Sequence, residues 1–359
     1  MQERTQFFIT LAVTALLLSC CVLLYFSCQD LHRKETLASQ NAREANAVVG
    51  RYFKFDSVIL GTSLSENFKC SEFDKITDGY SMKMTTAGGH ISEIVFMAEY
   101  AFKHQQIKNV LLDIFIGSYI LSEAPSQLPV ELYNDSMEYI DHLGESVKLR
   151  TILKYFKSIK RRKKENGFDR DGLYSWARAY PCGMTPFVKY LFEKEDEMKK
   201  HAAVMKNYDA SIVKKNIQNY LIPLIKKHQD VTFYVYLPPY SMVEFSTFFK
   251  VHKIFRKEFM DALLEFPNVR FYDFQSAESV ICNFSNYKDL YHYSESISRW
   301  LLSEMKVNNY LVTRENKFSF EQNFENVVKK FDLEKGLQQL RQHYLKQLDR
   351  MRTETGKAM

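Results

Sequence analysis

A serine near the start of the chain and an aspartate and a histidine near its end have the types and order of a nucleophilic triad. Ser63 follows Gly61 and Thr62 directly after a short apolar run, and Asp289 precedes His292 by three residues. A serine hydroxyl is a weak nucleophile at neutral pH, so it needs a base within hydrogen-bond reach that is itself oriented by a third group. Histidine can be that base because its ordinary pKa lies near neutrality. These residues therefore predict acyl transfer through Ser63.

Two adjacent glycines between these positions are candidates for stabilising a negatively charged oxygen. Gly88 and Gly89 precede a helical pattern, and backbone N–H groups at glycine can approach an oxyanion closely. Taken singly, each feature has a commoner structural explanation, such as a turn after a strand, a helix cap beside a surface histidine, or a Gly-Gly turn. Their joint order along the chain favours a catalytic site.

The elements that must position these residues alternate between strands and helices. Short apolar runs predict buried strands, and apolar positions at steps of three and four predict helices. We expect strands at 56–61, 108–115, 231–237 and 268–274, and helices at 91–102, 212–225, 243–265 and around Trp300. This alternation predicts a mainly parallel sheet covered by helices on both faces. Ligands bind beyond the carboxyl ends of such strands, which is where the candidate residues fall.

Three segments flank or interrupt this α/β domain, which we place at 47–315. Residues 29–46 form a charged, helix-prone connector, and 122–207 are irregular and carry both a basic cluster and Trp176, which is typical of a long insertion or a lid. Residues 316–359 repeat apolar positions every three or four residues among charges. That pattern predicts an amphipathic helical extension that packs on the domain or on a partner.

An apolar run at 7–28 contains no charged side chain and follows a short tail at 1–6. About 20 apolar residues suffice to cross the hydrocarbon core of a bilayer, so we expect one uncleaved transmembrane helix. A cleaved signal peptide is the competing interpretation, but the run is longer than is usual for one and no A-x-A site follows. The flanking charges do not decide the orientation in favour of an external domain.

Composition argues against several other classes. A net charge of +6 over 359 residues is mild and dispersed, which does not indicate a nucleic-acid partner. Three of the six cysteines lie in the apolar run, and the others are too widely spaced for a disulfide framework or a zinc site. Since the sequence also lacks a P-loop and a dinucleotide fingerprint, we expect neither a metal nor a cofactor.

The segments that carry the triad candidates resemble the SGNH/GDSL hydrolases, in which G-x-S comes early and D-x-x-H late. Residues 59–67 and 286–295 are similar to a membrane-anchored branch of that superfamily, which includes the teichoic-acid D-alanyl transfer protein and the alginate O-acetylation proteins. Residues 236–240 and 272–274 fit the same branch. The resemblance covers about 50–315, and its two outer segments together are fairly specific.

The resemblance implies a flavodoxin-like α/β/α sandwich of the SGNH type outside the cytoplasm, on a single membrane span. It implies that Ser63 is the nucleophile, His292 the general base and Asp289 its orienting partner. The backbone N–H groups of Ser63 and of Gly88 or Gly89 would then line the oxyanion hole.

One motif departs from the superfamily pattern. A Gly-x-Asn-Asp motif usually follows the third conserved strand and supplies an oxyanion donor from its Asn, whereas 113–118 here reads Asp-Ile-Phe-Ile-Gly-Ser. The third donor is therefore unassigned, and we expect Asp113 to be structural or to face the substrate. Asn67 and Tyr240 lie in the segments that carry the resemblance and are candidates for oxyanion or substrate contact, although aromatic side chains more often pack in a core.

The expected function is that of a membrane-anchored serine acyltransferase or esterase acting on O-acyl groups of cell-surface polysaccharide. The resemblance implies a membrane-bound O-acyltransferase as a partner. The main alternative is a catalytically silent scaffold that uses the same fold to bind that acyltransferase or a glycan, and the missing Asn keeps this alternative open. A secreted lipase-like enzyme is a third interpretation.

Overall fold

The computed structural model describes residues 42–122, 133 and 169–356. The expected tail and anchor at 1–28, most of the connector and the basic cluster at 160–164 lie outside the described residues. Within the described part, no helix is both long and apolar enough to cross a bilayer. The chain divides into two compact units, 1–52 with 127–168, and 53–126 with 169–359. The smaller unit contributes helix α2 (Ala42–Tyr52), and everything below concerns the larger unit.

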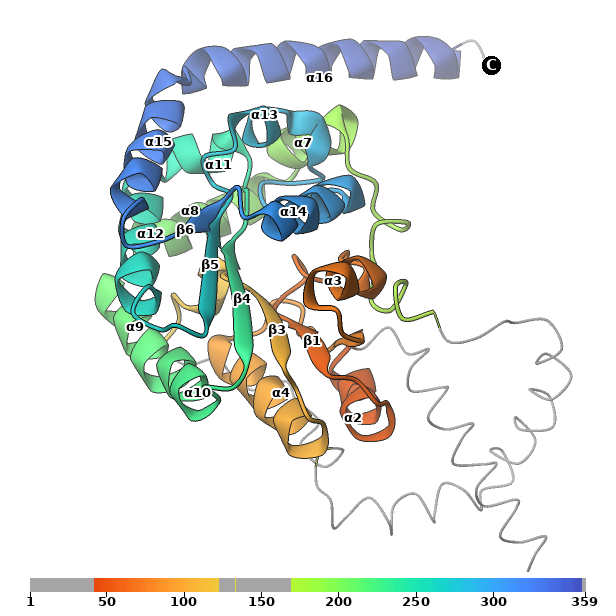
Figure 1. Ribbon diagram of the computed structural model, residues 1–359. Coiled ribbons are helices and arrows are strands. Elements are labelled where there is room, and N and C mark those ends of the chain that lie inside the picture. Colours follow the sequence, from red (N-terminus) through yellow and green to blue (C-terminus); the bar gives the residue numbers. More distant parts are fainter. Residues whose placement is uncertain (1–41, 123–132, 134–168, 357–359) are drawn as a thin grey trace, which may run out of the picture. The chain divides into compact units, whose positions relative to one another are not determined.

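A six-stranded sheet forms the centre of the larger unit, in the order β2-β1-β3-β4-β5-β6 (Figure 1). The first five strands run parallel, and β6 pairs antiparallel with β5. Every residue of β1 is buried, which explains a continuous apolar run instead of an alternating one. The strands are β1 (Ser57–Leu60), β2 (Ser81–Lys83), β3 (Asn109–Asp113), β4 (Thr232–Leu237), β5 (Val269–Asp273) and β6 (Leu311–Val312).

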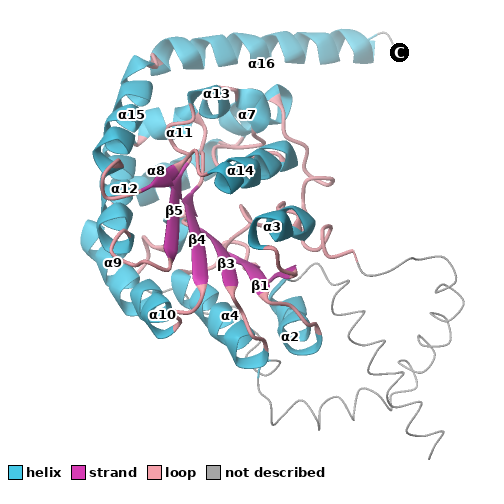
Figure 2. Ribbon diagram, in the orientation of Figure 1, coloured by secondary structure: helices cyan, strands magenta, loops and turns pink. Residues whose placement is uncertain are grey.

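Helices cover both faces of the sheet (Figure 2). Because β2 and β3 lie on opposite sides of β1, right-handed crossovers require their connecting helices to lie on opposite faces. Accordingly α3 (Cys70–Thr77) packs against α14 (Glu295–Val307), whereas α4 (Ile91–His104), α9 (Ala210–Asn216) and α12 (Phe249–Leu263) belong to the other layer. The shorter elements are η1 (Ile116–Ser118), the π-turn η4 (Ile217–Leu221), α10 (Ile222–Lys227), α11 (Met242–Thr247), α13 (Glu278–Ile281) and η5 (Phe284–Asn286).

This architecture confirms the predicted α/β class and its mainly parallel sheet. The sequence did not reveal β2, because this three-residue strand contains Lys83 and has no apolar run. The amine of Lys83 is buried and donates to the carbonyl oxygens of Glu66 and Asp171, each at 2.9 Å. The sequence also did not reveal two-residue β6, which follows the predicted strand at 268–274. The helix expected at 243–265 is divided at Phe248 into α11 and α12.

The described part of the expected insertion is more regular than the sequence suggested. Residues 184–206 form α7 (Met184–Glu193) and α8 (Glu195–Lys206), so only 169–183 is irregular there. The apolar face of α7 buries Phe187, whose ring stacks on Phe284 at a centroid distance of 5.0 Å. This tertiary contact stabilises α7, a helix that the sequence did not predict.

The C-terminal region forms α15 (Lys317–Lys330) and α16 (Leu333–Gly356). Helix α16 lies along α7, where the Tyr344 hydroxyl donates to Glu193 at 2.9 Å and the Gln347 amide to Thr185 at 2.8 Å. Leu340 is buried in this contact region of α16, whereas Leu345 is exposed. The described part of α16 therefore packs on the domain.

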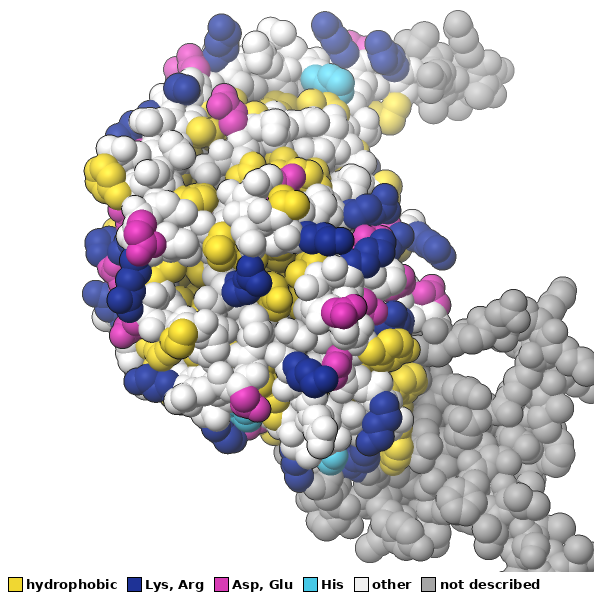
Figure 3. All heavy atoms as spheres, in the orientation of Figure 1, with side chains coloured by type: hydrophobic (Ala, Val, Ile, Leu, Met, Phe, Trp, Pro, Cys, Tyr) yellow, Lys and Arg dark blue, Asp and Glu magenta, His cyan; other side chains and the backbone are white. Residues whose placement is uncertain are grey.

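Charged side chains are dispersed over the surface of the larger unit. On the face shown in Figure 3, Lys and Arg lie among Asp, Glu and uncharged residues and do not gather into one field. Many lysines pair with nearby carboxylates, as Lys69 does with Glu295 at 2.8 Å. The positive net charge therefore does not translate into a single basic surface on this face.

Candidate active site

The structure brings together the three residues of the predicted triad. The Ser63 hydroxyl lies 2.8 Å from Nε2 of His292, and Nδ1 of the same ring lies 2.8 Å from Oδ2 of Asp289. Ser63 stands in the turn after β1, and the other two residues stand in the loop before α14, at the carboxyl edge of the parallel sheet. This is the geometry in which a histidine can take the serine proton while a carboxylate orients it.

The loop that carries Asp289 and His292 is folded by Asp289 itself. Oδ1 of Asp289 accepts the backbone N–H groups of Tyr291 at 2.9 Å and His292 at 2.8 Å, which turns the chain back within three residues. Burial raises the pKa of Asp289, but the charge of His292 and these hydrogen bonds outweigh burial and hold it below its usual value. The carboxylate is therefore ionised at neutral pH.

A buried aspartate holds the turn that carries Ser63. Asp113 is fully buried at the end of β3 and accepts hydrogen bonds at 2.7 Å from the backbone N–H of Thr62 and from the hydroxyl of Ser65. Burial raises its pKa to about 6, although the hydrogen bonds from Ser65 and Thr62 act in the opposite direction. Gly61 has φ +118°, and a Cβ there would lie 2.2 Å from the Asp113 carboxylate, so the turn requires glycine.

The structure distinguishes between the two candidate glycines. Gly89 is buried and its N–H donates to the Thr86 carbonyl at 2.8 Å, so this group is not free for an oxyanion. Gly88 is exposed at φ +62°, and its N–H, like that of Ser63, has no partner among the described residues. The Thr86 N–H donates to the Gly61 carbonyl at 2.8 Å, which connects the turn at Gly88 and Gly89 to the turn that carries Ser63. Gly88 is the better candidate donor.

Trp176, from the expected insertion, lies against the triad. Its indole N–H donates to the Ser63 carbonyl at 2.8 Å, and its ring stands edge-on to the His292 ring at 5.4 Å. The sequence placed Trp176 in an irregular segment and did not predict that it lies at the triad. Its contacts with Ser63 and His292 depend on the fold, which no local pattern reveals.

Asn67 holds the segment that carries Trp176. Its side-chain oxygen accepts from the Ser175 hydroxyl at 3.2 Å and from the Ala177 backbone N–H at 3.1 Å. The side-chain NH2 of Asn67 is buried and has no partner within the described residues. The oxygen therefore anchors a loop, and only the NH2 is left for any contact with an oxyanion.

Tyr240 does not fit the expected substrate contact. Its side chain is fully buried, and its hydroxyl accepts the Ile116 backbone N–H at 3.1 Å. Its ring packs against the rings of Phe115, Tyr291 and Phe245. The strand-end position that made it a candidate places it in the core, so its role is to support the sheet edge.

A buried polar cluster that the sequence did not reveal supports Tyr291, the residue before His292. The Tyr291 hydroxyl lies 2.6 Å from the His201 ring, which in turn lies 2.9 Å from Glu244, and Glu244 also contacts His252 at 3.0 Å. Burial raises the pKa of Glu244, but the hydrogen bonds from the two histidines outweigh it and hold the pKa below its usual value. In the described part of the chain, no group of His, Cys, Asp and Glu has an arrangement that could hold a metal ion.

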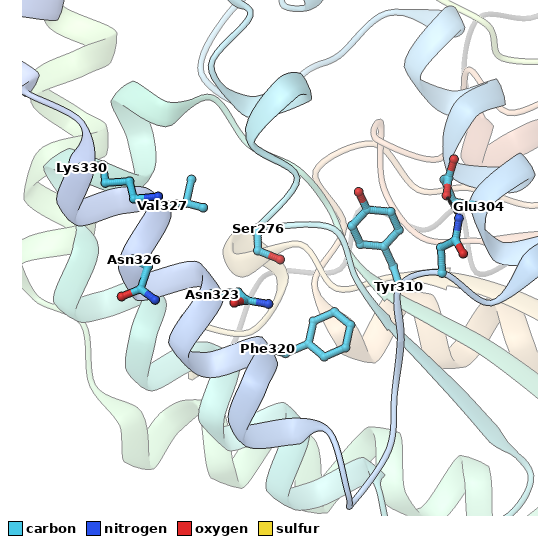
Figure 4. Close-up of a pocket in the computed structure, with 9 residues that line it drawn as sticks. Ser276, Glu304, Tyr310, Phe320, Asn323, Asn326, Val327 and Lys330 are labelled. Atoms are coloured by element: carbon cyan, nitrogen blue, oxygen red, sulfur yellow. Dashed lines mark hydrogen bonds between the residues drawn. The ribbon is translucent and has the colours of Figure 1, made fainter.

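A pocket of about 540 Å³ lies apart from the triad, at the β6 edge of the sheet (Figure 4). Its lining comes mainly from α15, with Ser276, Glu304 and Tyr310 on the opposite side. Among the described residues no histidine lines this pocket, so Ser276 has no neighbouring imidazole there. Chemistry is better supported at Ser63, where the His292 side chain is 22% exposed and accessible to a substrate.

Comparisons with known proteins do not identify a family. No protein-family model matches the chain, and no curated protein sequence matches it. Among solved structures, one described as "a putative platelet activating factor from Streptococcus pneumonia" aligns with 78% of this chain and 96% of its own, at 9% identity and a TM-score of 0.34. Similarity at this level supports no functional conclusion.

Proposed function

We propose that this chain is a serine acyltransferase or esterase of the SGNH type that works through an acyl-enzyme. The observation that carries the proposal is the continuous Ser63–His292–Asp289 contact, with 2.8 Å at each step. The strand order β2-β1-β3-β4-β5 supports a flavodoxin-like sandwich, with the triad at the edge where such sheets bind ligands.

In the proposed reaction, the Ser63 oxygen attacks the acyl carbonyl while Nε2 of His292 takes the hydroxyl proton. Asp289 stabilises the resulting imidazolium, and the N–H groups of Ser63 and Gly88 donate to the carbonyl oxygen as it becomes negative. The bond to the alcohol then breaks, and His292 returns the proton to that alcohol. A water or an acceptor hydroxyl next attacks the acyl group, giving up its proton to His292, and Ser63 leaves with that proton.

The third oxyanion donor is a separate part of the proposal. The stretch 113–118 supplies no Asn, whereas the NH2 of Asn67 is buried beside the loop that contacts Ser63 and has no protein partner among the described residues. An unpaired buried donor is costly unless a ligand or water satisfies it. We therefore assign Asn67 as the candidate third donor.

The setting of the reaction follows only from the resemblance. On that basis we propose a single membrane span at 7–28, a domain outside the cytoplasm and O-acyl groups of cell-surface polysaccharide as substrate. A membrane-bound O-acyltransferase would supply the acyl groups. The second candidate function is a silent scaffold that binds this acyltransferase or a glycan, and it is favoured by the absence of Asn from 113–118.

Labelling with a fluorophosphonate distinguishes the two functions, because the reagent modifies only an activated serine. We expect an adduct on Ser63 of the full-length chain in detergent, located by peptide mass spectrometry, and its loss in His292→Ala. Ser285→Ala, which removes an exposed hydroxyl near the same loop, should label like the wild type. A folded protein whose Ser63 stays unlabelled would support the scaffold.

A further inference from the structure

A buried hydrogen-bond network of three hydroxyl groups begins at the carboxyl of Asp113. The Ser65 hydroxyl lies 2.7 Å from Oδ2 of Asp113 and 3.2 Å from the Tyr236 hydroxyl. The Tyr236 hydroxyl lies 3.2 Å from that of Tyr293, which donates to the Leu64 carbonyl at 3.3 Å. Each of these five residues is at most 2% exposed, so the hydroxyl groups depend on one another for their hydrogen bonds.

The last bond of this network joins the two sides of the triad. Tyr293 directly follows His292, and Leu64 directly follows Ser63. The bond from the Tyr293 hydroxyl to the Leu64 carbonyl therefore connects the loop of His292 to the turn of Ser63. No other described residue donates to this buried carbonyl, so loss of the bond leaves the carbonyl unpaired, which is costly.

The number of bonds in the network depends on whether Asp113 carries a proton. Each hydroxyl has one hydrogen to donate. With Asp113 protonated, each group donates to the next, from the carboxyl to the Leu64 carbonyl, and all four bonds form. With Asp113 ionised, Ser65 must donate to the carboxylate, and two phenol hydrogens remain for three contacts. The charge orients the hydroxyl groups toward itself, so the bond to Leu64 is the one that is lost.

No neighbouring charge sets the protonation of Asp113. Burial raises its pKa to about 6 against the hydrogen bonds that it accepts, so both protonation states are reached near neutral pH. The titratable side chains around it are tyrosines whose pKa values burial also raises, from the end of η1, from β4, from the loop after β4 and from the loop before α14: Tyr119, Tyr236, Tyr240 and Tyr293. Because these phenols stay protonated, Asp113 alone among them changes charge near neutral pH.

We propose that Asp113 and Tyr293 are positioning residues, and that the proton on Asp113 fixes the placement of His292 against Ser63. The inference rests on the proposed function and adds a means of regulation to it. Protonation completes the connection between the loop of His292 and the turn of Ser63, and ionisation releases it. The site thus responds to pH through a buried group that does not contact the substrate.

The pKa of Asp113 tests the network without reference to activity. It is taken from the pH dependence of the difference in unfolding free energy between the full-length chain in detergent and its Asp113→Asn variant. Without the Tyr293 hydroxyl the protonated network loses two bonds and the ionised network only one. Tyr293→Phe should therefore lower the pKa of Asp113 by about one unit, measured against the double variant with Asp113→Asn.

Two further variants complete this measurement. Tyr236→Phe breaks the network one position earlier and should lower the pKa of Asp113 by a similar amount. Tyr287→Phe is the matched control, because it removes an equally buried hydroxyl of the same loop that donates to Pro239 at 3.0 Å, outside the network. The control should leave the pKa of Asp113 unchanged. A pKa that stays the same or rises in Tyr293→Phe and Tyr236→Phe would overturn the proposal.

The rate at which the fluorophosphonate labels Ser63 tests the connection to the triad. The side-chain NH2 introduced by Asp113→Asn can donate to Ser65 at every pH, as the protonated carboxyl does. We expect Asp113→Asn to label like the wild type at pH 5 and about fivefold faster at pH 8, the effect of about one hydrogen bond. The titration of His292 is common to both proteins and cancels in this ratio of rates.

The Tyr293→Phe background locates the effect in the network. There the rates with and without Asp113→Asn should agree at both pH values. A ratio that does not change with pH, or that changes equally in the Tyr293→Phe background, would overturn the proposal. Lowered pKa values of Asp113 without any labelling of Ser63 would reject only the enzyme, and labelling with an unchanged pKa of Asp113 would reject only the network.

Discussion

At the scale of single residues, the proposed reactivity of Ser63 depends on which ring nitrogen of His292 carries the proton. Asp289 accepts from the Nδ1 side of the ring, which leaves Nε2 free to accept the serine proton. The Asp289 carboxylate thus determines that Nδ1 of His292 carries the proton. The same carboxylate also folds the loop by accepting two backbone N–H groups. These two roles can be separated experimentally.

Asp289→Asn should separate them. The Asn oxygen can still accept the backbone N–H groups, but its NH2 favours the wrong histidine tautomer, so we expect ester hydrolysis to fall by about 10³–10⁴. Initial rates with 4-nitrophenyl acetate measure the loss, and the midpoint of thermal unfolding should stay near the wild-type value. A rate within tenfold of wild type would remove Asp289 from the mechanism.

Asp113 predicts a pH dependence of stability. Its pKa is raised from 3.8 to about 6, so the protonated carboxyl stabilises the folded state relative to the ionised one. This contribution to the unfolding free energy is present below about pH 4 and is lost as pH rises through 6. From pH 4 to 7 the wild type should lose about 2 kcal/mol of unfolding free energy relative to Asp113→Asn, which cannot ionise. Denaturant unfolding at several pH values measures both proteins. Parallel curves would mean that Asp113 is not the group responsible.

At the scale of elements, the loop at 169–183 completes the site from outside the sheet. Asn67→Ala removes both of its side-chain bonds to this loop, so we expect faster amide exchange around Trp176 and slower labelling of Ser63. Asn67→Asp keeps the acceptor oxygen and should preserve the slow exchange. The comparison uses hydrogen exchange followed by mass spectrometry, and equal exchange in Asn67→Ala and wild type would contradict the anchoring role.

The sequence predicted the elements whose signals are local, and missed those that depend on distant partners. The four apolar strands and the D-x-x-H spacing are readable because burial and a tight turn impose them directly. Strand β2 is hidden because its lysine is satisfied by carbonyl oxygens from two other segments. Likewise, Gly89 differs from Gly88 because its N–H donates to the Thr86 carbonyl, which the sequence does not show. The buried position of Tyr240 depends on a contact with Ile116 from a distant part of the chain.

At the scale of the whole molecule, helix α16 supports the loop of Asp289 and His292 indirectly, through α7 and the stacked rings of Phe187 and Phe284. Leu340→Ala, at a buried position on α16, should lower the unfolding free energy by about 2–3 kcal/mol. Leu345→Ala on the same helix removes an exposed side chain and should change it by about 0.5 kcal/mol or less. Equal effects in denaturant unfolding would show that α16 does not pack on the domain in solution.

Ser63 and His292 are also synthesised at different times during translation. Ser63 and His292 are separated by 229 positions, and translation proceeds at about 5–20 residues per second. A nascent chain that already contains Ser63 therefore needs about 10–50 s more before His292 has been synthesised. During that interval the Ser63 hydroxyl lacks the base that we propose activates it, so we expect an unfinished polypeptide not to become acylated at this position.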